Sequence, residues 1–413
     1  MKNRKAIWYI HPYAGGPGVG RYDRAYHLCR YFQKRGHPSL IIAPSYHHLM
    51  DAEQRPGDTR VEGVDYHFMW SPPYHGNGLG RLINMFFFAK MLARRLEALT
   101  HRHGKPGLVI ASSPHPYVWP AISDIGRQFG AQRVFEVRDI WPQSLVDLGG
   151  LSPRHPFVRY TESIELKAYR DADAIVSLLP LTQTYMARRG LDPHRWHHIP
   201  NGVEVSNIHA PETPSACLDL ARQWRASGFH VVVYAGAMGK PNGVESLLRA
   251  LAVAGDRAHN VRVIIVGRGE SEAVLRNMAT APDIANRAAV FGQISKAATL
   301  SLLRCASAGY MSLIEEPVFS FGISPNKLYD YMLTGIPVVA AINAGNNPVN
   351  DARCGVCAEP NDPQSIADAL CHLFSLTEEE RREMGSRGRD YVLEHHTYEH
   401  LADEYLKLMA TSS

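Results

Sequence analysis

Short apolar runs alternate with longer segments of helical period along the whole chain, and this alternation restricts the fold more than any other feature of the sequence. It is typical of βαβ units, in which helices join the parallel strands of a sheet. Two such series are visible. The first predicts a helix at 22–35, closed by Gly36, and strands at 6–11, 40–43, 108–111, 134–137, 174–178 and 197–199. The second predicts helices at 244–254 and 297–304 and strands at 231–235, 261–266 and 338–341.

The length of 413 residues exceeds what one ordinary core accommodates. The segment between the two series, 200–228, is rich in Pro, Asn and Ser, which is typical of a domain boundary. We therefore expect an α/β chain with an N-terminal domain at 1–200 and a C-terminal domain at 201–390. Residues 377–409 are predicted to be helical, and the chain end at 391–413 is long enough to cross back to the first domain.

Composition excludes several classes of protein. A net charge of +4 is small for this length and does not imply bulk nucleic-acid binding. The apolar run at 6–10 is too short for a signal peptide, and no run reaches transmembrane length, so we expect a cytoplasmic protein. The six cysteines, including Cys354 and Cys357, are expected to be reduced packing residues. The 21 histidines lack the spacing of a zinc motif, and pairs such as His47 and His48 are expected to be exposed.

Ligands of open α/β sheets bind beyond the carboxyl ends of the strands, so the loops that follow strands are the candidate sites. The first such loop, 12–21, reads Pro-Tyr-Ala-Gly-Gly-Pro-Gly-Val-Gly-Arg and leads into a helix. Its glycines, among them Gly16 and Gly18, allow close backbone approach to an anion or a sugar, with Arg21 beside them. The loop lacks the G-x-G-x-x-G order, and no acidic residue ends the second strand. A tight turn without a ligand therefore stays open as the alternative.

The second loop follows the strand at 134–137 and contains the adjacent residues Arg138 and Asp139. At a strand's carboxyl end this pair is suited to hold a substrate hydroxyl or a phosphate. His115 follows the neighbouring strand at 108–111 and is expected to face the pair. The alternative is an internal ion pair between Arg138 and Asp139.

The third segment, 322–337, carries the boundary signals of a short helix. Ser324 is a suitable N-cap, Pro325 suits the first helical position, Gly335 suits the left-handed position after the helix, and Pro337 prevents continuation.

The first turn of this predicted helix points to an anion. Lys327 lies where the helix dipole disfavours a cation, and a bound diphosphate would remove that conflict. Asn326 and Asp330 share a face with Lys327, so Asp330 is placed to accept ribose hydroxyls. The alternative is a plain surface pair between Lys327 and Asp330.

Two further segments allow simpler interpretations. The acidic pair in Asp171-Ala-Asp173 precedes a strand, so it is at the wrong end for a ligand and is predicted to form a helix-to-strand turn.

The helix predicted at 79–99 has apolar residues beyond its core-facing stripe. Such a helix lies on an anionic membrane surface or is thoroughly buried, and both interpretations stay open. The extra apolar residues are Ile83, Phe87, Phe88 and Met91, and the flanking basic residues are Arg81, Lys90, Arg94 and Arg95.

Taken with these segments, the sequence resembles family four of the retaining glycosyltransferases, which have the GT-B fold: two facing Rossmann-like domains with parallel sheets and an interdomain cleft. The likeness runs along nearly the whole chain. The motif sequences at 138–142 and 325–327 resemble those of the family branch that adds N-acetylated amino sugars, such as fucosamine, to bacterial O-antigen and capsule. The motifs that carry the resemblance are 15–20, 136–142, Ile199-Pro-Asn-Gly-Val203, Tyr234-Ala-Gly236, Val266-Gly-Arg-Gly269 and 324–337.

The resemblance implies a metal-independent enzyme without a cofactor, whose second domain binds the nucleotide sugar and whose Asp330 holds the ribose. Three positions depart from the family pattern. Gly322 stands where many members have a glutamate, and Ala237 and Asn242 stand where the family has an arginine and a lysine. The predicted catalytic residues are His115, Arg138 and Asp139. The predicted donor-binding residues are Gly16, Gly18, Arg21, Gly236, Lys240, Gly267, Arg268, Ser324, Asn326, Lys327 and Asp330.

The implied reaction moves a sugar from a nucleotide diphosphate, best matched by UDP, to an acceptor with retention at the anomeric carbon. The departing diphosphate is stabilised by preorganised cations and dipoles, and the acceptor hydroxyl is expected between the domains near Gly16, His115 and Asp139. A lipid-linked saccharide is the expected acceptor, with peripheral contact at the inner face of the plasma membrane. The alternatives are a nucleotide-sugar epimerase or hydrolase, a nicotinamide-dependent oxidoreductase, and a binding-only protein.

Overall fold

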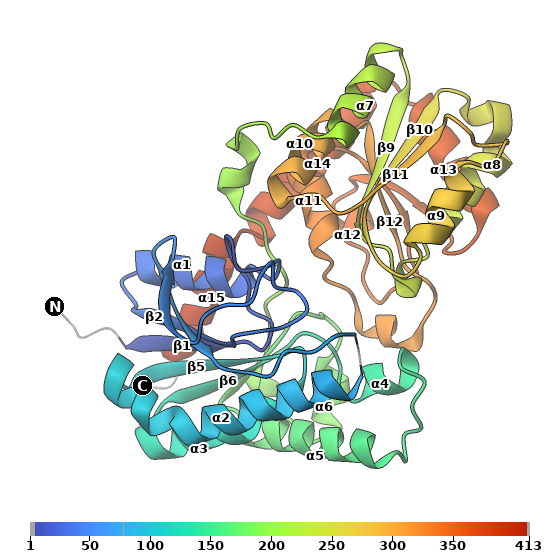
Figure 1. Cartoon of the computed structure of the whole chain (residues 1–413). Helices are drawn as coiled ribbons and strands as arrows, with labels where there is room; N and C mark the ends of the chain where they lie inside the picture. The colour runs from blue at the N-terminus through green and yellow to red at the C-terminus, as the bar shows by residue number, and fades with distance from the viewer. Residues whose placement is uncertain (1–4, 77, 411–413) are drawn as a thin grey trace. The chain divides into compact units, whose positions relative to one another are not determined.

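The computed structural model describes residues 5–76 and 78–410, and these form two compact units (Figure 1). The N-terminal unit comprises residues 1–201 and 398–413, and the C-terminal unit comprises 202–397. The outer limits predicted at residues 1 and 413 lie outside the described residues. None of the described helices is both long and apolar enough to cross a membrane.

The N-terminal unit is built on an eight-stranded sheet in the order β3-β4-β2-β1-β5-β6-β7-β8. All neighbours pair in parallel except β3, which runs antiparallel to β4 at the sheet edge. The strands are β1 (Ala6–Ile10), β2 (Ser39–Pro44), β3 (Gly57–Val61), β4 (Val64–Met69), β5 (Pro106–Ser113), β6 (Gln132–Val137), β7 (Ala174–Ser177) and β8 (Trp196–His198).

Helices cover both faces of this sheet, with α1 and α15 on one face and α2, α3 and α5 on the other (Figure 1). Strand β1 shows why: Ile7 and Tyr9 join the cluster beneath α1 and α15, while Trp8 faces the opposite side and is equally buried. The helices are α1 (Arg24–Lys34), α2 (Leu79–His103), α3 (Trp119–Phe129), α4 (Gln143–Asp147), α5 (Pro156–Asp171), α6 (Gln183–Ala187) and α15 (Tyr398–Ala410).

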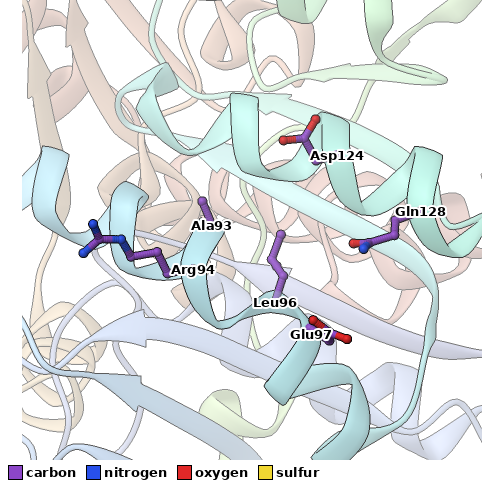
Figure 2. A pocket seen from close by; sticks show the side chains of 6 residues that line it. All are labelled: Ala93, Arg94, Leu96, Glu97, Asp124 and Gln128. Atoms are coloured by element: carbon purple, nitrogen blue, oxygen red, sulfur yellow. The ribbon is translucent and has the colours of Figure 1, made fainter.

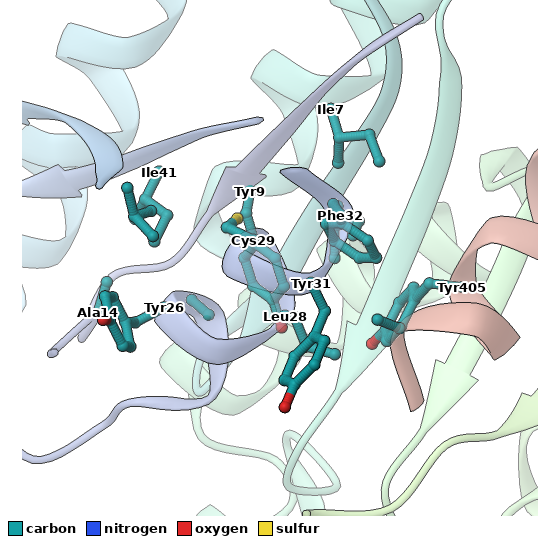
Figure 3. Close-up of a cluster of buried hydrophobic side chains, with 14 of the residues drawn as sticks. Ile7, Tyr9, Ala14, Tyr26, Leu28, Cys29, Tyr31, Phe32, Ile41 and Tyr405 are labelled. Carbon is teal, nitrogen blue, oxygen red and sulfur yellow. The ribbon is translucent and has the colours of Figure 1, made fainter. Parts of the chain in front are cut away.

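The C-terminal helix α15 packs against α1 in the core of the N-terminal unit (Figure 3). Tyr405 lies edge-on to Phe32 with 6.1 Å between ring centroids, and it is fully buried. The returning segment begins at Tyr398, seven residues later than the limit predicted at 391. The reason is that α14 (Glu378–His395) continues through this region and packs on α11 of the C-terminal unit.

The C-terminal unit is built on a six-stranded parallel sheet in the order β11-β10-β9-β12-β13-β14. Its strands are β9 (His230–Ala237), β10 (Val261–Arg268), β11 (Ala288–Phe291), β12 (Ala308–Ser312), β13 (Val338–Ala341) and β14 (Gly355–Ala358). Its helices are α7 (Ala216–Ala226), α8 (Glu245–Ala254), α9 (Glu272–Ala279), α10 (Lys296–Cys305), α11 (Asn326–Thr334), α12 (Pro348–Asp351), α13 (Pro363–Ser375) and α14. Two sheets of this kind give the GT-B fold, as predicted.

Several strands were not predicted, for reasons visible in their sequences. Strand β3 reads Gly-Asp-Thr-Arg-Val and is largely exposed, so it has no apolar run and forms only by pairing with β4. Strand β12 contains Gly309, whose missing side chain leaves room for the ring of Tyr331.

The helix-to-strand turn at 171–173 is confirmed: α5 ends at Asp171, and Asp173 accepts hydrogen bonds from the backbone and side chain of Arg133.

Candidate functional site

In the C-terminal unit the candidate site lies where β9 ends and α11 begins. Helix α11 begins at Asn326, one residue later than predicted, because Pro325 has extended backbone angles and occupies the N-cap position. Ser324 is therefore not the N-cap, and its hydroxyl instead lies 3.4 Å from the Tyr329 hydroxyl. The predicted end is confirmed, since Gly335 is left-handed with φ of 72°.

Lys327 points from the first turn of α11 toward β9. Its Nζ donates hydrogen bonds to the Tyr234 hydroxyl at 2.9 Å and to Asn242 Oδ1 at 2.5 Å, and it lies 4.5 Å from the centroid of the Tyr234 ring. Burial lowers the pKa of the Lys327 ammonium to about 7. The surface pair between Lys327 and Asp330 does not form, because Asp330 is engaged elsewhere.

Asp330 is buried on the same helix, and both of its carboxylate oxygens accept hydrogen bonds from Lys296 Nζ, at 2.6 and 2.5 Å. Lys296 is the first residue of α10, directly after the N-cap Ser295. Sequence reasoning missed Lys296, although a signal was present. A cation in the first turn of a helix is disfavoured without an anionic partner, and the same argument applied to Lys327 would have singled it out.

The predicted glycines have packing roles at this end of the sheet. A side chain at Gly236 would come within 3.1 Å of the Lys327 side chain, so Gly236 makes room for it. A side chain at Gly267 would come within 1.8 Å of the Gly236 carbonyl oxygen, so the close approach of β9 and β10 requires glycine there.

Three predicted donor-binding side chains are exposed around this centre: Lys240, Arg268 and Asn326. Arg268 is the register partner of Ala237 across β9 and β10. The sheet therefore places an arginine beside the position where the family's arginine is replaced by Ala237. Lys240 opens a short 3-10 helix (Lys240–Asn242) after β9, and its backbone N–H donates to Glu270.

In the N-terminal unit the glycine-rich loop after β1 is closed by its own hydrogen bonds. The backbone N–H of Gly16 donates to the Gly20 carbonyl at 2.9 Å, and the Tyr66 hydroxyl donates to the Gly15 carbonyl at 2.7 Å. A side chain at Gly16 would come within 2.7 Å of that hydroxyl, so glycine is required by packing. Gly18 is exposed with φ of 68° and open space around it, and Arg21 is also exposed.

Glu136 at the end of β6 is fully buried and binds several donors. It accepts hydrogen bonds from Tyr9 at 2.7 Å, from Arg24 Nε at 3.0 Å, from Ser112 at 2.6 Å, and from Tyr405. The neighbouring guanidinium groups hold the pKa of the Glu136 carboxyl well below its usual range, against the effect of burial. This network fixes α1 and α15 to the sheet.

Arg138 is buried next to this network. Its Nη1 lies 3.7 Å from Glu136 Oε1, and its guanidinium lies 4.7 Å from the centroid of the Tyr22 ring. Its Nη2 donates to Asn201 Oδ1 at 3.5 Å. Arg138 forms its internal ion pair with Glu136, and its charge also acts on Asp139, against the burial that raises the pKa of that carboxyl.

His115 is fully buried after β5, and within the described part of the chain neither of its ring nitrogens has a hydrogen-bond partner. Its ring lies 5.7 Å from Tyr13 and 5.1 Å from Tyr117, centroid to centroid. Burial, followed by the charge of Arg81, lowers the pKa of His115 to about 3, so the imidazole is neutral at physiological pH.

His11, at the end of β1, is a further buried histidine that sequence reasoning missed. Its Nδ1 accepts a hydrogen bond from the backbone N–H of Tyr13 at 2.9 Å, which places the proton of the neutral ring on Nε2. Among the described residues that buried Nε2 has no acceptor. The available signal was position, since His11 directly follows the first strand.

The expectation of exposed histidines is wrong for His47. It is fully buried, and its Nε2 lies 3.0 Å from the Ala14 carbonyl oxygen. His48 beside it bonds the Tyr74 hydroxyl. Because these residues directly follow β2, they fill the space beneath the glycine-rich loop. The carboxyl end of this sheet is therefore lined by aromatic rings and neutral imidazoles.

Helix α2 is neither fully buried nor apolar all round. Phe88 is buried, but Leu79 is 77% exposed, Ile83 is 58% exposed, and Trp70 beside the helix is 50% exposed. Phe87, half-buried, meets the Trp70 ring edge-on with 4.9 Å between centroids.

A small surface pocket farther along α2 contains none of the predicted site residues (Figure 2). It is lined by Ala93, Arg94, Leu96, Glu97, Asp124 and Gln128.

Comparisons with known proteins agree with this architecture. Residues 18–202 match the model "Glycosyl transferase 4-like domain", and residues 229–375 match "Glycosyl transferases group 1". Sucrose-phosphate synthase from Thermosynechococcus elongatus has a similar structure, with a TM-score of 0.75, 16% identity and 99% of each chain covered. HepE from Anabaena, solved in complex with UDP, has a TM-score of 0.68 and 16% identity, with 98% of this chain and 100% of HepE covered.

The two matched domains together place this chain among the glycosyltransferases with the GT-B fold. A curated relative is the GDP-mannose-dependent alpha-(1-6)-phosphatidylinositol dimannoside mannosyltransferase of Mycobacterium tuberculosis, which is 24% identical over 240 residues. That alignment covers 58% of this chain and 59% of the relative, so the two match over little more than half their lengths.

Proposed function

We propose that this chain is a retaining glycosyltransferase that takes a sugar from a nucleotide diphosphate donor bound by the C-terminal unit. The arrangement at the start of α11 carries the proposal. Lys327 is held between Tyr234 and Asn242 at the carboxyl end of β9, beside the N-terminus of α11, where no side-chain cap is found among the described residues. A diphosphate supplies the negative charge that this partly buried ammonium lacks. No metal ion or organic cofactor is part of the proposal.

In this proposal Asp330 accepts the ribose hydroxyls, while Lys296 pairs with its carboxylate and orients it. Arg268 and Lys240, both exposed at the same edge, add positive charge for the diphosphate as it departs. These cations replace the arginine and lysine that the family has at positions 237 and 242.

For the donor we propose a UDP-linked, N-acetylated amino sugar. The UDP complex of HepE supports uridine diphosphate as the nucleotide of the donor. The motif sequences at 138–142 and 325–327 support an N-acetylated amino sugar. The mannosyltransferase of M. tuberculosis is named for GDP-mannose, so a decisive donor panel contains both UDP-linked and GDP-linked sugars.

The N-terminal unit is proposed to bind the acceptor at the carboxyl end of its sheet. There, within the described part of the chain, both ring nitrogens of His115 and Nε2 of His11 are buried without a hydrogen-bond partner: neutral His115 offers one donor and one acceptor, and His11 offers a donor. A sugar hydroxyl satisfies both kinds of group. Neutral His115, whose lowered pKa makes it a weak base, is proposed to accept a hydrogen bond from the attacking hydroxyl, while Arg138 and Asp139 orient the acceptor.

A lipid-linked saccharide is the proposed acceptor, with α2 resting on the membrane surface. Leu79, Ile83 and Phe87 follow one another at four-residue spacing on this helix, with Trp70 alongside, and the exposed Lys90 and Arg94 continue the row. The phosphatidylinositol dimannoside in the name of the M. tuberculosis relative is an acceptor of this kind.

Flotation with liposomes containing anionic lipid tests this contact. The double variant Leu79→Ser with Ile83→Ser is expected to lose most of the membrane-bound fraction, whereas Val274→Ser, at a 52% exposed apolar residue of the C-terminal unit, is expected to retain it. Phe88 is unsuitable for the test, because it is buried. Equal binding by the double variant and the wild type would reject the membrane contact.

Nucleotide release tests the proposed function itself. Donors from the UDP and GDP panel are incubated in EDTA with and without lipid-linked acceptor extract. We expect release of one nucleotide only when acceptor is present, and its loss in Asp330→Ala but not in the exposed control Asp390→Ala. Turnover without acceptor would support the epimerase or hydrolase, tight nucleotide binding without turnover would support a binding-only protein, and consumption of NADH would support the oxidoreductase.

A further inference from the structure

A second cluster of chemically active side chains lies at the edge of the N-terminal sheet, apart from the residues assigned to the acceptor. Asp58 on β3 and His67 on β4 are direct register partners across the antiparallel pair. His103, the last residue of α2, reaches the same point from the helix. One hairpin and the end of a helix distant from it in sequence thus bring one carboxylate and two imidazoles together.

The ligand atoms of these residues converge. His67 Nδ1 lies 2.5 Å from Asp58 Oδ1, and His103 Nε2 lies 3.1 Å from the same oxygen. All three ligand atoms are within 4.8 Å of one another. His67 is nearly sealed from solvent, and the buried His103 Nε2 has no hydrogen-bond partner among the described residues despite its closeness to Asp58.

We propose that Asp58, His67 and His103 form a binding site for a divalent transition metal of the zinc type. Two neutral imidazoles and one carboxylate are a ligand set that zinc uses, with ligand bonds of about 2.0–2.2 Å and hence about 3.3 Å between ligand atoms in a tetrahedron. The two spacings to Asp58 Oδ1, 2.5 and 3.1 Å, are shorter than that value, and all three ligand atoms lie within 4.8 Å of one another, so side-chain rotations that open these contacts bring the three atoms to a common ion. Water completes the fourth position from the open side of the site.

The surroundings of Asp58 support this assignment. Arg102, the residue before His103, contacts Asp58 Oδ2. The guanidinium thereby holds one carboxylate oxygen and directs the other, Oδ1, toward the two imidazoles. Partners that orient a ligating carboxylate in this way are a regular feature of metal sites. Asp58 and His103 also line a surface pocket that gives an ion access from solvent.

The proposed metal has a structural role and is independent of the proposed glycosyl transfer. It would connect the β3–β4 hairpin, whose edge strand is weakly buried, to the end of α2. Binding free energy at such a site adds to the stability of the folded unit, since the unfolded chain does not present the three ligands together.

Equilibrium dialysis of the chelator-treated full chain against Zn²⁺, followed by metal analysis and thermal unfolding, tests the proposal. We expect one tightly bound zinc per chain and a raised transition temperature in the wild type. His103→Ala and Asp58→Asn are expected to bind at least about tenfold more weakly and to lose the temperature shift. His101→Ala, two residues away and 81% exposed, is the matched control and is expected to behave as wild type.

Loading the wild-type chain with Co²⁺ in place of Zn²⁺ gives a second readout, which does not depend on the folding of a variant. A visible absorption spectrum of low-coordinate Co²⁺ in the wild-type chain is the expected result. Zinc binding of equal strength in His103→Ala and Asp58→Asn would mean that other surface histidines hold the ion, and would overturn the proposal. The absence of a tightly bound zinc, or a purely octahedral Co²⁺ spectrum, would overturn it as well.

Discussion

The Nζ atom of Lys327 lies 2.5 Å from Oδ1 of Asn242. Asn242 stands where related glycosyltransferases have a lysine after the first strand of the donor domain, and here a lysine reaches that place from α11. We propose that, with a diphosphate bound, Lys327 together with Arg268 and Lys240 supplies the positive charge that position 242 lacks. The missing lysine at 242 is therefore compatible with diphosphate binding.

Nucleotide binding should be coupled to proton uptake at Lys327. The pKa of this ammonium is lowered to about 7, so at pH 8 the free protein carries it mostly neutral, and a bound diphosphate restores the charged form. Calorimetry of UDP binding in buffers of different ionisation enthalpy should show uptake approaching about 0.9 proton at pH 8 and much less at pH 6.

Two variants separate this effect from the ionisation of the nucleotide itself. Lys327→Met should bind UDP about 10-fold to 150-fold more weakly, the range of a charged hydrogen bond of about 1.5–3 kcal/mol, and its proton uptake should vanish. Lys327→Arg keeps a charge that does not titrate, so it should bind without uptake. Unchanged uptake in both variants would assign the proton to another group.

The pair Lys296 and Asp330 should act as a unit in donor binding. Asp330→Asn keeps the shape but removes the charge that Lys296 holds, and Lys296→Met leaves the buried carboxylate without this partner. We expect each single variant to raise the KM for the donor about tenfold or more, and the double variant to do little worse than either. Strictly multiplicative effects on KM would show that the two residues act independently.

Glu136 should be a stability residue. Glu136→Gln replaces an acceptor of several buried hydrogen bonds by an amide that is half donor, and we expect a loss of about 3–5 kcal/mol in the unfolding of the N-terminal unit at pH 7. Glu97→Gln on the exposed face of α2 should change stability by less than about 0.5 kcal/mol.

The sign of the pH dependence follows from the lowered pKa of Glu136. A carboxyl with a folded pKa below its unfolded value stabilises the protein above the unfolded value of about 4.3 and loses that contribution as pH falls. Urea titrations should therefore show the difference between wild type and Glu136→Gln shrinking below pH 4. A difference that stays constant between pH 7 and pH 3 would contradict an ionised Glu136.

His115→Phe should separate catalysis from folding. The ring is buried with both nitrogens unpartnered in the described structure, so phenylalanine fills its place without losing a hydrogen bond, and stability should be equal or higher. If His115 accepts a hydrogen bond from the attacking hydroxyl, kcat should fall up to about tenfold while the donor KM stays unchanged.

The control is Tyr117→Phe, which keeps the ring stacked on His115 and removes only the hydroxyl bonded to Thr161. Because the pKa of His115 is about 3, the wild-type rate should show no acidic limb from this residue between pH 5 and 8. Unchanged kcat in His115→Phe would remove His115 from the mechanism.

The sequence predicted those helices and strands in which the local capping residues and the pattern of apolar residues match the burial seen in the structure. Helix α11 illustrates this, since Gly335 ends it in the left-handed conformation as expected. The edge strand β3 was missed because its polar residues form a strand only through pairing with β4. Lys296 and His11 carried local signals, a cation in a first helical turn and a position after a strand, but their partners, Asp330 and the buried aromatic cluster, become visible only in the tertiary structure.

The most direct test of glycosyl transfer follows a sugar labelled with ¹³C at its anomeric carbon. The labelled UDP donor is incubated with the wild-type chain and lipid-linked acceptor in EDTA, and the products are examined by NMR. We expect the label on the acceptor, with the anomeric configuration of the donor retained. Label found only in free sugar, in an epimerised donor, or on the acceptor with inverted configuration would contradict a retaining glycosyltransferase.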